Sequence, residues 1–414
     1  MTIFIIAFLI CIFFLSFRSN YFLAPSNMVF GNYFLYFVMP AFLFIIFDFF
    51  RIEYILPWGM INDWSQLTIQ PLLHYLYCFF LVFGIFRIFE SGLWSSGSHL
   101  NIAVDIRNFW LALFLICGAM VTIFYTLSTG GMSWILNYQE TYLLGKEGLG
   151  FYNILLIWYA HFLAFILGLN VFKARKKINL PLLIIAIAII SWLAYIQGVK
   201  SRIPLLLLFF FSPILFNMKL RLMPGIYLTA GLLILFSVGM YFRSEGFYSS
   251  PRMAFEYLLS YFNTIFLHEM VLNDIESYSD FGIFTPFTKY LEIFDDRVIR
   301  SDYDLSVYLT QLYYPEHWEQ GATQQWPLES SFYIALPHEI FWILPTFLWA
   351  IMTFVWVYLF RYSLFFLFPF VFEVTRVFSV FRGGIFSWEI IVNYVFIIFF
   401  FICFNFLIKK LDQR

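Results

Sequence analysis

The chain has 414 residues, of which 62% are hydrophobic and 12% are charged, and its mean hydropathy is +0.82. This composition excludes an ordinary soluble protein, because a chain of this length cannot bury so much apolar surface in water. The net charge of −1 says nothing about partners, so the information lies in where the charges fall along the chain.

Long apolar runs predict an all-α, polytopic membrane protein with about eleven membrane-spanning helices. We expect spans one to eight within 1–242, a long loop at 243–337, and spans nine to eleven with a short tail at 338–414, in one integrated membrane domain. The first run lacks the basic region and cleavage site of a signal peptide, so we interpret it as a span. The predicted spans are 2–17, 28–50, 69–89, 108–128, 151–172, 179–198, 203–217, 226–242, 338–360, 363–381 and 387–408.

The motif KARKK, from Lys173 to Lys177, sets the predicted orientation, since short loops rich in Lys and Arg lie in the cytoplasm. Alternation from this loop places 13 of the 24 Lys and Arg on the cytoplasmic side, five in the long loop and six in other external segments. The long loop is therefore predicted to be extracytoplasmic. It is also acidic, with 14 of the 25 Asp and Glu.

Residues 251–272 of the long loop are predicted to form an amphipathic helix, which Ser250 can cap. Apolar side chains share one face and His268 lies largely opposite. This pattern favours a helix along the membrane interface, or equally one packed on the bundle. Gly and Pro interrupt segments 279–290 and 313–331, so we expect these to be loops.

Segment 313–331 contains Trp318 and Trp326 among carboxamides and carboxylates. Flat aromatic faces with such neighbours suit sugar rings, so both tryptophans are candidate glycan-binding residues. The alternative is an ordinary membrane interface, which has the same composition.

Cations gather at the predicted outer ends of spans, where ionisable residues are functional candidates. Lys200 and Arg202 lie in a short turn, Arg243 ends the eighth span, and Arg376 and Arg382 belong to the tenth span and its outer end. Converging, they would form a pocket for a lipid-linked diphosphate, whose oxygens arginine binds bidentately. The alternatives are snorkelling anchors and structural ion pairs.

Other ionisable residues are more ambiguous. Glu373 and Arg376 are spaced i,i+3, so an ion pair between them is as plausible as a role in binding. His338 and Glu339 open the ninth span at the same outer level, where either residue could deprotonate a hydroxyl. We interpret His161 as a packed, hydrogen-bonded histidine, and His74 carries no functional signal.

The order of these parts resembles one family, the O-antigen polymerases, also called Wzy or oligosaccharide repeat-unit polymerases, which are distant relatives of the O-antigen ligases. The resemblance rests on GVKSRIPLLLL (Gly198 to Leu208), on YFRSEGFYSSPRMAFEYLLSYFN (Tyr241 to Asn263) and on the overall layout. The chain departs from the family pattern at LPHEIFWILP, where a Gly-rich entry is usual, and at Ile203, where relatives often have Gly.

The resemblance implies a GT-C-like glycosyltransferase of the bacterial inner membrane, with its active site facing the periplasm. It would polymerise undecaprenyl-diphosphate-linked repeat units, with undecaprenyl diphosphate as the leaving group. The implied roles are diphosphate binding by Arg202 and Arg243, with Lys200, Arg376 and Arg382 in support.

His338 or Glu339 would activate the acceptor in this scheme. No cofactor, metal or nucleic acid is expected. Membrane lipids, a chain-length regulator and the flippase are possible partners.

Three other classes stay open. An O-antigen ligase has the same arrangement of spans and long loop. A structural or scaffold protein of the membrane, without enzymatic activity, is another alternative. A flippase or other transporter is disfavoured by the single long loop and by the lack of an internal repeat. The four cysteines fall in predicted spans without paired spacing, so they indicate neither disulfides nor a metal cluster.

Overall fold

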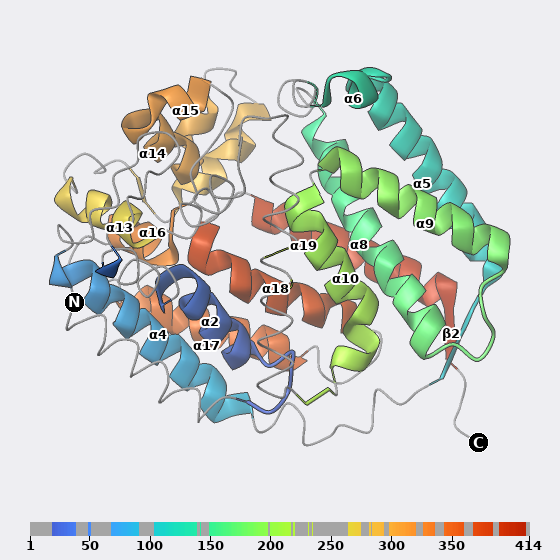
Figure 1. The fold of residues 1–414 in the computed structure, drawn as a ribbon, viewed down its shortest axis with the longest axis horizontal. Helices are drawn as coiled ribbons and strands as arrows, with labels where there is room; N and C mark the ends of the chain where they lie inside the picture. The colour runs from blue at the N-terminus through green and yellow to red at the C-terminus, as the bar shows by residue number, and fades with distance from the viewer. Residues whose placement is uncertain are drawn as a thin grey trace. The chain divides into compact units, whose positions relative to one another are not determined.

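In the residues that it describes, the computed structural model is mostly helical (Figure 1). It describes residues 19–38, 49–50, 68–90, 103–138, 141, 149–197, 199–216, 218–219, 231, 234, 264–274, 281–282, 284–293, 298–319, 326–335, 343–359, 367–383 and 389–410. The elements before residue 220 are α2 (Pro25–Tyr33), the π-helix η1 (Phe34–Val38), α4 (Ile69–Phe89), β1 (Val104–Ile106), α5 (Asn108–Ser128), α6 (Ser133–Leu136), α8 (Gly150–Phe172), α9 (Leu180–Gln197) and α10 (Val199–Leu215). Those after it are α13 (Thr264–Asn273), the 3-10 helices η7 (Thr285–Ile293) and η8 (Arg300–Asp302), α14 (Leu305–Tyr313), α15 (Pro315–Glu319), α16 (Leu328–Ala335), α17 (Ile343–Leu359), α18 (Leu367–Gly383), α19 (Glu389–Leu407) and β2 (Ile408–Lys410).

Four helices in the described part of the chain, α4, α5, α8 and α9, are long and apolar enough to cross a membrane. The bounds of α4 and α5 coincide with predicted spans 69–89 and 108–128. Shorter apolar stretches lie in α10, α17 and α19. The chain is thus an all-α membrane protein, as predicted, while the number of eleven spans stays a prediction. The first predicted span lies outside the described residues.

The chain divides into two compact units. Unit 1 comprises Met1–Trp94, Lys219–Tyr358 and Glu373–Ile390, and unit 2 comprises Ser95–Met218, Leu359–Phe372 and Ile391–Arg414.

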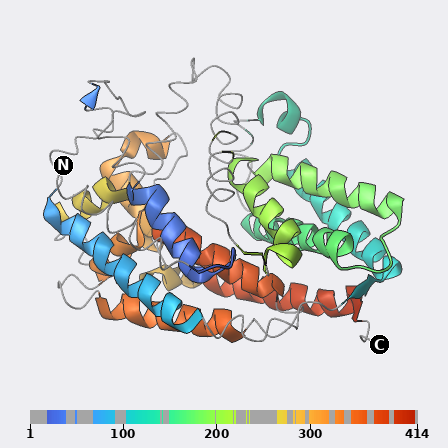
Figure 2. The ribbon, with the colours of Figure 1, turned by 60° about the horizontal axis from the view of Figure 1, so that its bottom comes forward.

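Unit 2 is built around α8, which packs against α5, α9 and α10 (Figures 1 and 2). Aromatic side chains fill its core. Phe162 lies 5.3 Å from Phe368 and 5.1 Å from Phe400, measured between ring centroids. Trp158 donates its indole N–H to Asn393 Oδ1 at 3.0 Å. These contacts fix the apolar bundle on which the candidate site lies.

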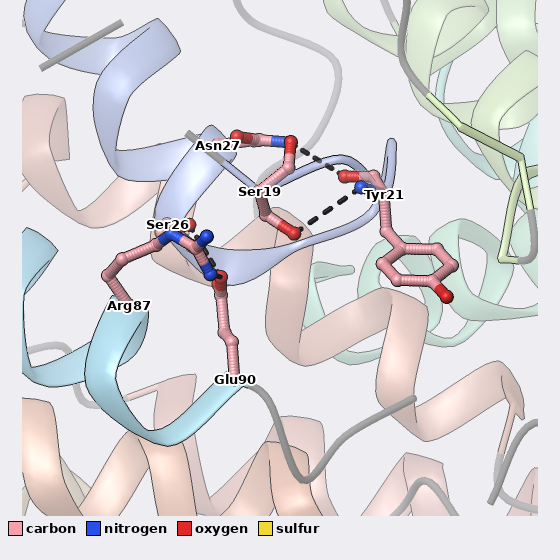
Figure 3. Close-up of polar contacts among 6 residues, drawn as sticks. All are labelled: Ser19, Tyr21, Ser26, Asn27, Arg87 and Glu90. Carbon is pink, nitrogen blue, oxygen red and sulfur yellow. Dashed lines mark hydrogen bonds and ion pairs between the residues drawn. The ribbon is translucent and has the colours of Figure 1, made fainter. Parts of the chain in front are cut away.

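In unit 1, α2 packs against α4, and a carboxylate holds the end of one helix to the start of the other. Glu90, just after α4, accepts hydrogen bonds from Ser26 N at 2.6 Å and from Ser26 Oγ at 2.7 Å (Figure 3). Ala24 at the N-cap of α2 has no side-chain acceptor, so Glu90 supplies the negative partner that a helix N-terminus favours. Burial raises the pKa of Glu90 to about 7, although the Ser26 bonds and Arg87 lower it.

The side chain of Asn27 stabilises the turn that precedes α2, residues 19–24. Its Nδ2 donates to Ser19 O at 3.0 Å and to Tyr21 O at 2.6 Å, as Figure 3 shows. A short β-bridge between Tyr21 and Lys219 ties the same turn to a distant segment.

The long loop contains more helix than the sequence indicates. The loops expected at 279–290 and 313–331 instead include η7, α15 and the first half of α16. Pro315 stands at the first position of α15, where its fixed φ favours the helix, so this proline begins a helix rather than interrupting one. Residues 251–263 of the predicted amphipathic helix lie outside the described residues.

The part of that helix that is described, α13, packs against α4 and α16. His268, expected on its polar face, is fully buried. The expectation was wrong for this residue because neighbouring helices cover both sides of α13. The packed alternative, rather than an open interface, fits this segment.

Candidate functional site

Arg202 is the predicted site residue that the structure describes most fully. It lies in the first turn of α10, so the short turn predicted at Lys200 and Arg202 was wrong because both residues are helical; the Arg202 side chain is half-buried in unit 2. The first backbone N–H groups of a helix lack intrahelical partners and carry partial positive charge. A guanidinium in this turn adds a full positive charge, so the start of α10 favours an anion.

The start of α10 lies deep along α8. A Cβ at Gly168 would collide with the carbonyl oxygen of Phe210, so the two backbones touch there. Toward the C-terminal end of both helices, Phe172 of α8 lies 5.9 Å from Phe211 of α10 between ring centroids, so the two helices run in parallel. Arg202 precedes this contact by eight residues, or about 12 Å at 1.5 Å per residue. Arg202 therefore lies roughly 15 Å beyond Gly150, the first residue of α8.

Two buried side chains of unit 2, those of His161 and Gln197, have polar atoms without a hydrogen-bond partner among the described residues. His161 is 7% exposed, packs on Phe209 at 5.0 Å between ring centroids, and interacts electrostatically with Arg202. Gln197, the last residue of α9, is 5% exposed. Neither His161 Nε2 nor Gln197 Nε2 has a hydrogen-bond partner among the described residues. His161 is thus packed as predicted, but its Nε2 accepts or donates no hydrogen bond among the described residues.

An unsatisfied buried polar atom costs about 1–3 kcal/mol, so the nitrogens of His161 and Gln197 need a partner, such as water, an ion or a ligand group. A guanidinium, a helix N-terminus, an imidazole and a carboxamide all offer N–H donors. This donor set suits the oxygens of a phosphate or diphosphate. The described residues include no group of three His, Cys, Asp or Glu that could hold a metal ion.

Arg376 forms the ion pair that its spacing suggests. Its Nε donates to Glu373 Oε2 at 3.0 Å in unit 1, and the Glu373 side chain is fully buried. A carboxylate at this distance offsets much of the charge that Arg376 would offer to a diphosphate. The structure therefore favours the ion-pair alternative for Arg376.

The structure describes only part of the remaining predicted site, which comprises three cations and two candidate acid–base residues. Arg243, His338 and Glu339 lie outside the described residues. Lys200 and Arg382 belong to α10 and α18, and only their helical backbone is described. Convergence of the five cations stays a prediction.

The two tryptophans proposed for glycan binding differ in their surroundings. Trp326 is fully buried and packs on Tyr313, with 5.7 Å between ring centroids. Its Nε1 has no acceptor among the described residues. Trp318, in α15, is half-buried. Trp326 thus offers no open face to a sugar in this structure, whereas part of the Trp318 side chain is exposed to solvent.

The sequence did not reveal a buried polar cluster in unit 1, where three helices meet. His74 Nδ1 on α4 lies 2.9 Å from His268 Nε2 on α13, and His268 Nδ1 lies 3.1 Å from Ser330 Oγ on α16. Tyr333 covers this chain of hydrogen bonds, with its ring 5.4 Å from that of His74. Burial, with a smaller contribution from His74, holds the pKa of His268 well below its usual value, so His268 is neutral.

Glu329, next to Ser330 on α16, extends the cluster to α2. Its Oε1 accepts from the Tyr33 hydroxyl at 2.7 Å. Glu329 is 1% exposed, and its Oε2 accepts no hydrogen bond of full geometry from the described residues, although the Cys78 thiol lies nearby. Burial raises the pKa of this carboxyl to about 7.

One sequence signal could have found this cluster. His74 and His268 each interrupt an apolar run, in PLLHYLYC and TIFLHEM. Ionisable residues in such runs are candidates by default. Their pairing could not be predicted, because 194 residues separate them in the chain.

Comparison with family models, curated proteins and solved structures finds no match to this chain.

Proposed function

We propose that this protein is a polytopic glycosyltransferase that polymerises oligosaccharide repeat units carried on a polyprenyl diphosphate. The proposal includes eleven spans, a GT-C-like arrangement, and an active site on the periplasmic side of a bacterial inner membrane. One observation carries it. Arg202 lies in the first turn of α10 and interacts electrostatically with His161, whose buried Nε2 has no hydrogen-bond partner among the described residues.

The proposed chemistry explains why such a site belongs in a membrane. A hydroxyl of the acceptor sugar attacks the anomeric carbon of the donor, a C–O bond forms, and the bond to the diphosphate breaks. The hydroxyl proton leaves to a base or to solvent, and negative charge builds on the departing polyprenyl diphosphate. Fixed N–H donors in a partly dry site stabilise that charge without reorganising. The apolar surface around the site accommodates the lipid tail.

Contacts between distant segments support the predicted alternation of the spans. β1 pairs with β2, and both belong to segments predicted to be cytoplasmic. Tyr21 and Lys219 form a bridge between two other segments predicted to be cytoplasmic. On the opposite side, Thr68 donates to Glu269 Oε2 at 2.9 Å, and both residues belong to predicted external segments.

The test uses purified full-length protein in lipid nanodiscs with a chemically defined lipid-linked repeat unit, without nucleotide sugar. We expect a ladder of polymer from the wild type. Arg202→Ala should lower the rate about 100- to 1,000-fold, the usual effect of removing one oxyanion-type donor. Arg300→Ala is the matched control, because Arg300 is an exposed arginine paired with Asp304 on the loop.

The outcomes separate the competing classes. Transfer only to a lipid A core acceptor would identify a ligase, and translocation of the repeat unit without bond formation would identify a transporter. Wild-type ladders from Arg202→Ala would remove the site assignment while leaving the polymerase function in place.

A further inference from the structure

Three distant segments of unit 2 join at one end of its bundle. β1 and β2 are antiparallel, with Val104 opposite Lys410 and Ile106 opposite Ile408. The strand β1 also binds the loop after α8, since Val104 N donates to Lys173 O at 3.2 Å and Arg175 N donates to Val104 O at 3.1 Å. Figures 1 and 2 show β2 at the end of α19, beside the start of α5.

The ribbon has an apolar inner face and a charged outer face. Val104, Ile106 and Ile408 are buried. Because side chains alternate along a strand, Asp105, Arg107 and Lys409 share the other face. Arg107 and Lys409 are both exposed, and Lys409 lies directly opposite Asp105.

Residues 103–107, 173–178 and 408–410 together form what we call the basic ribbon. They hold seven Lys or Arg and one acidic residue, Asp105. Lys177 is engaged, since its Nζ donates to Asn170 O at 2.7 Å and to Val171 O at 3.0 Å. Asp105 accepts from Lys176 N at 3.1 Å. The exposed side chains of this basic ribbon include Arg107, Arg175, Lys176 and Lys409.

Exposed aromatic side chains continue directly from the basic ribbon. Phe109 on α5 is 73% exposed and Phe406 on α19 is 53% exposed. Trp110 lies 5.8 Å from Phe406 between ring centroids, so the two helices present one aromatic surface. Arg107 N donates to Leu407 O at 2.9 Å, which brings the cation to the edge of this surface.

We propose that the basic ribbon and this aromatic surface form a binding site for one anionic phospholipid. The phosphate would contact Arg107 and Lys409, and an acyl chain would lie on Phe109 and Phe406. A lipid fits better than free phosphate or an acidic peptide because the charged and apolar surfaces are continuous at the end of membrane helices. The site is distinct from Arg202 and independent of the proposed reaction.

The experiment is native mass spectrometry of the purified full-length protein in detergent with equimolar phosphatidylglycerol and phosphatidylcholine. We expect retention of phosphatidylglycerol, with a preference that weakens as salt increases. The double variant Arg107→Gln/Lys409→Gln should lower the affinity for phosphatidylglycerol about 30-fold, because each surface cation contributes on the order of fivefold to tenfold. Binding of phosphatidylcholine should not change.

The control is Lys219→Gln/Arg300→Gln, which removes two exposed cations from unit 1 and should leave lipid binding unchanged. Asp105→Asn keeps the oxygen that accepts from Lys176 N, so we expect it to fold and to bind phosphatidylglycerol about fivefold more tightly. Equal retention of both lipids by the wild type, unchanged binding by the double variant, or competition by inorganic phosphate would each overturn the proposal.

Discussion

Gly168 sets how closely α8 and α10 approach, and we predict that Gly168→Ala disturbs both stability and function. The added Cβ would collide with the backbone carbonyl of Phe210. Ordinary contact needs about 3.5 Å, so the helices must separate by roughly 1–2 Å at this point. Overpacking of this kind costs about 1–3 kcal/mol, and the gain in helix propensity from Ala offsets at most about 1 kcal/mol.

The assay is thermal unfolding of the purified protein in detergent, followed by intrinsic tryptophan fluorescence. A net loss of about 1–2 kcal/mol predicts a fall in Tm of roughly 2–6 °C. Gly84→Ala is the matched control, because Gly84 lies within α4 and a Cβ there meets nothing within 4 Å. We expect Gly84→Ala to be neutral or slightly more stable.

The same substitution should lower transfer activity more than stability. Displacing α10 moves Arg202, and a displacement of about 1 Å at a catalytic group costs on the order of 100-fold in rate. Wild-type Tm and rate in Gly168→Ala would refute the close packing. Equal losses in Gly84→Ala would show that the effect belongs to glycine replacement in general.

Two further predictions concern buried carboxyl groups. Burial raises the folded-state pKa of Glu329 to about 7 from 4.5, so its contribution to stability is complete below pH 4.5 and is lost as pH rises through 7, by about 3 kcal/mol. Glu329→Gln should therefore flatten the fall in Tm between pH 5 and 8, and an unchanged slope would contradict the assignment. Ser26→Ala removes one of the two hydrogen bonds that Glu90 accepts and should cost about 1–2 kcal/mol, measured as a lower Tm, whereas a wild-type Tm would rule out this capping role.

Helix positions were largely predictable because the signal is local. The bounds of α4, α5, α8 and α9 agree with predicted spans to within one residue at each end. Asn108, for example, follows an exposed cation and opens an uninterrupted apolar run. A long apolar run can satisfy its own backbone hydrogen bonds within a membrane by forming a helix.

Long-range pairing was not predictable from one sequence. The ribbon joins residues 104–106 to 408–410, and nothing in either segment indicates the other. The isolated i,i+3 spacing of Glu373 and Arg376 did indicate their pair, because that contact lies within one helix. The helices of the long loop were not predicted, because Gly and Pro were interpreted as breaks. Pro315 in fact begins a helix.

The orientation of the chain is the last prediction, and an accessibility experiment can test it. The predicted alternation puts Arg175 in the cytoplasm and Arg300 outside, and both side chains are exposed in the structure. In a variant lacking the native cysteines, a membrane-impermeant thiol reagent applied to intact cells should label Arg300→Cys and spare Arg175→Cys. Permeabilised cells are the control, because both positions should then react.

Each possible result bears on the function. Labelling of Arg175→Cys in intact cells, with Arg300→Cys protected, would invert the topology and move the acidic loop into the cytoplasm. Because Arg175 is bonded to β1 through its backbone and β1 pairs with β2, such a result would also carry residues 104–106 and 408–410 to the outside. The predicted result keeps the start of α10 toward the outer side. There, a lipid-linked oligosaccharide that has already crossed the membrane can reach Arg202.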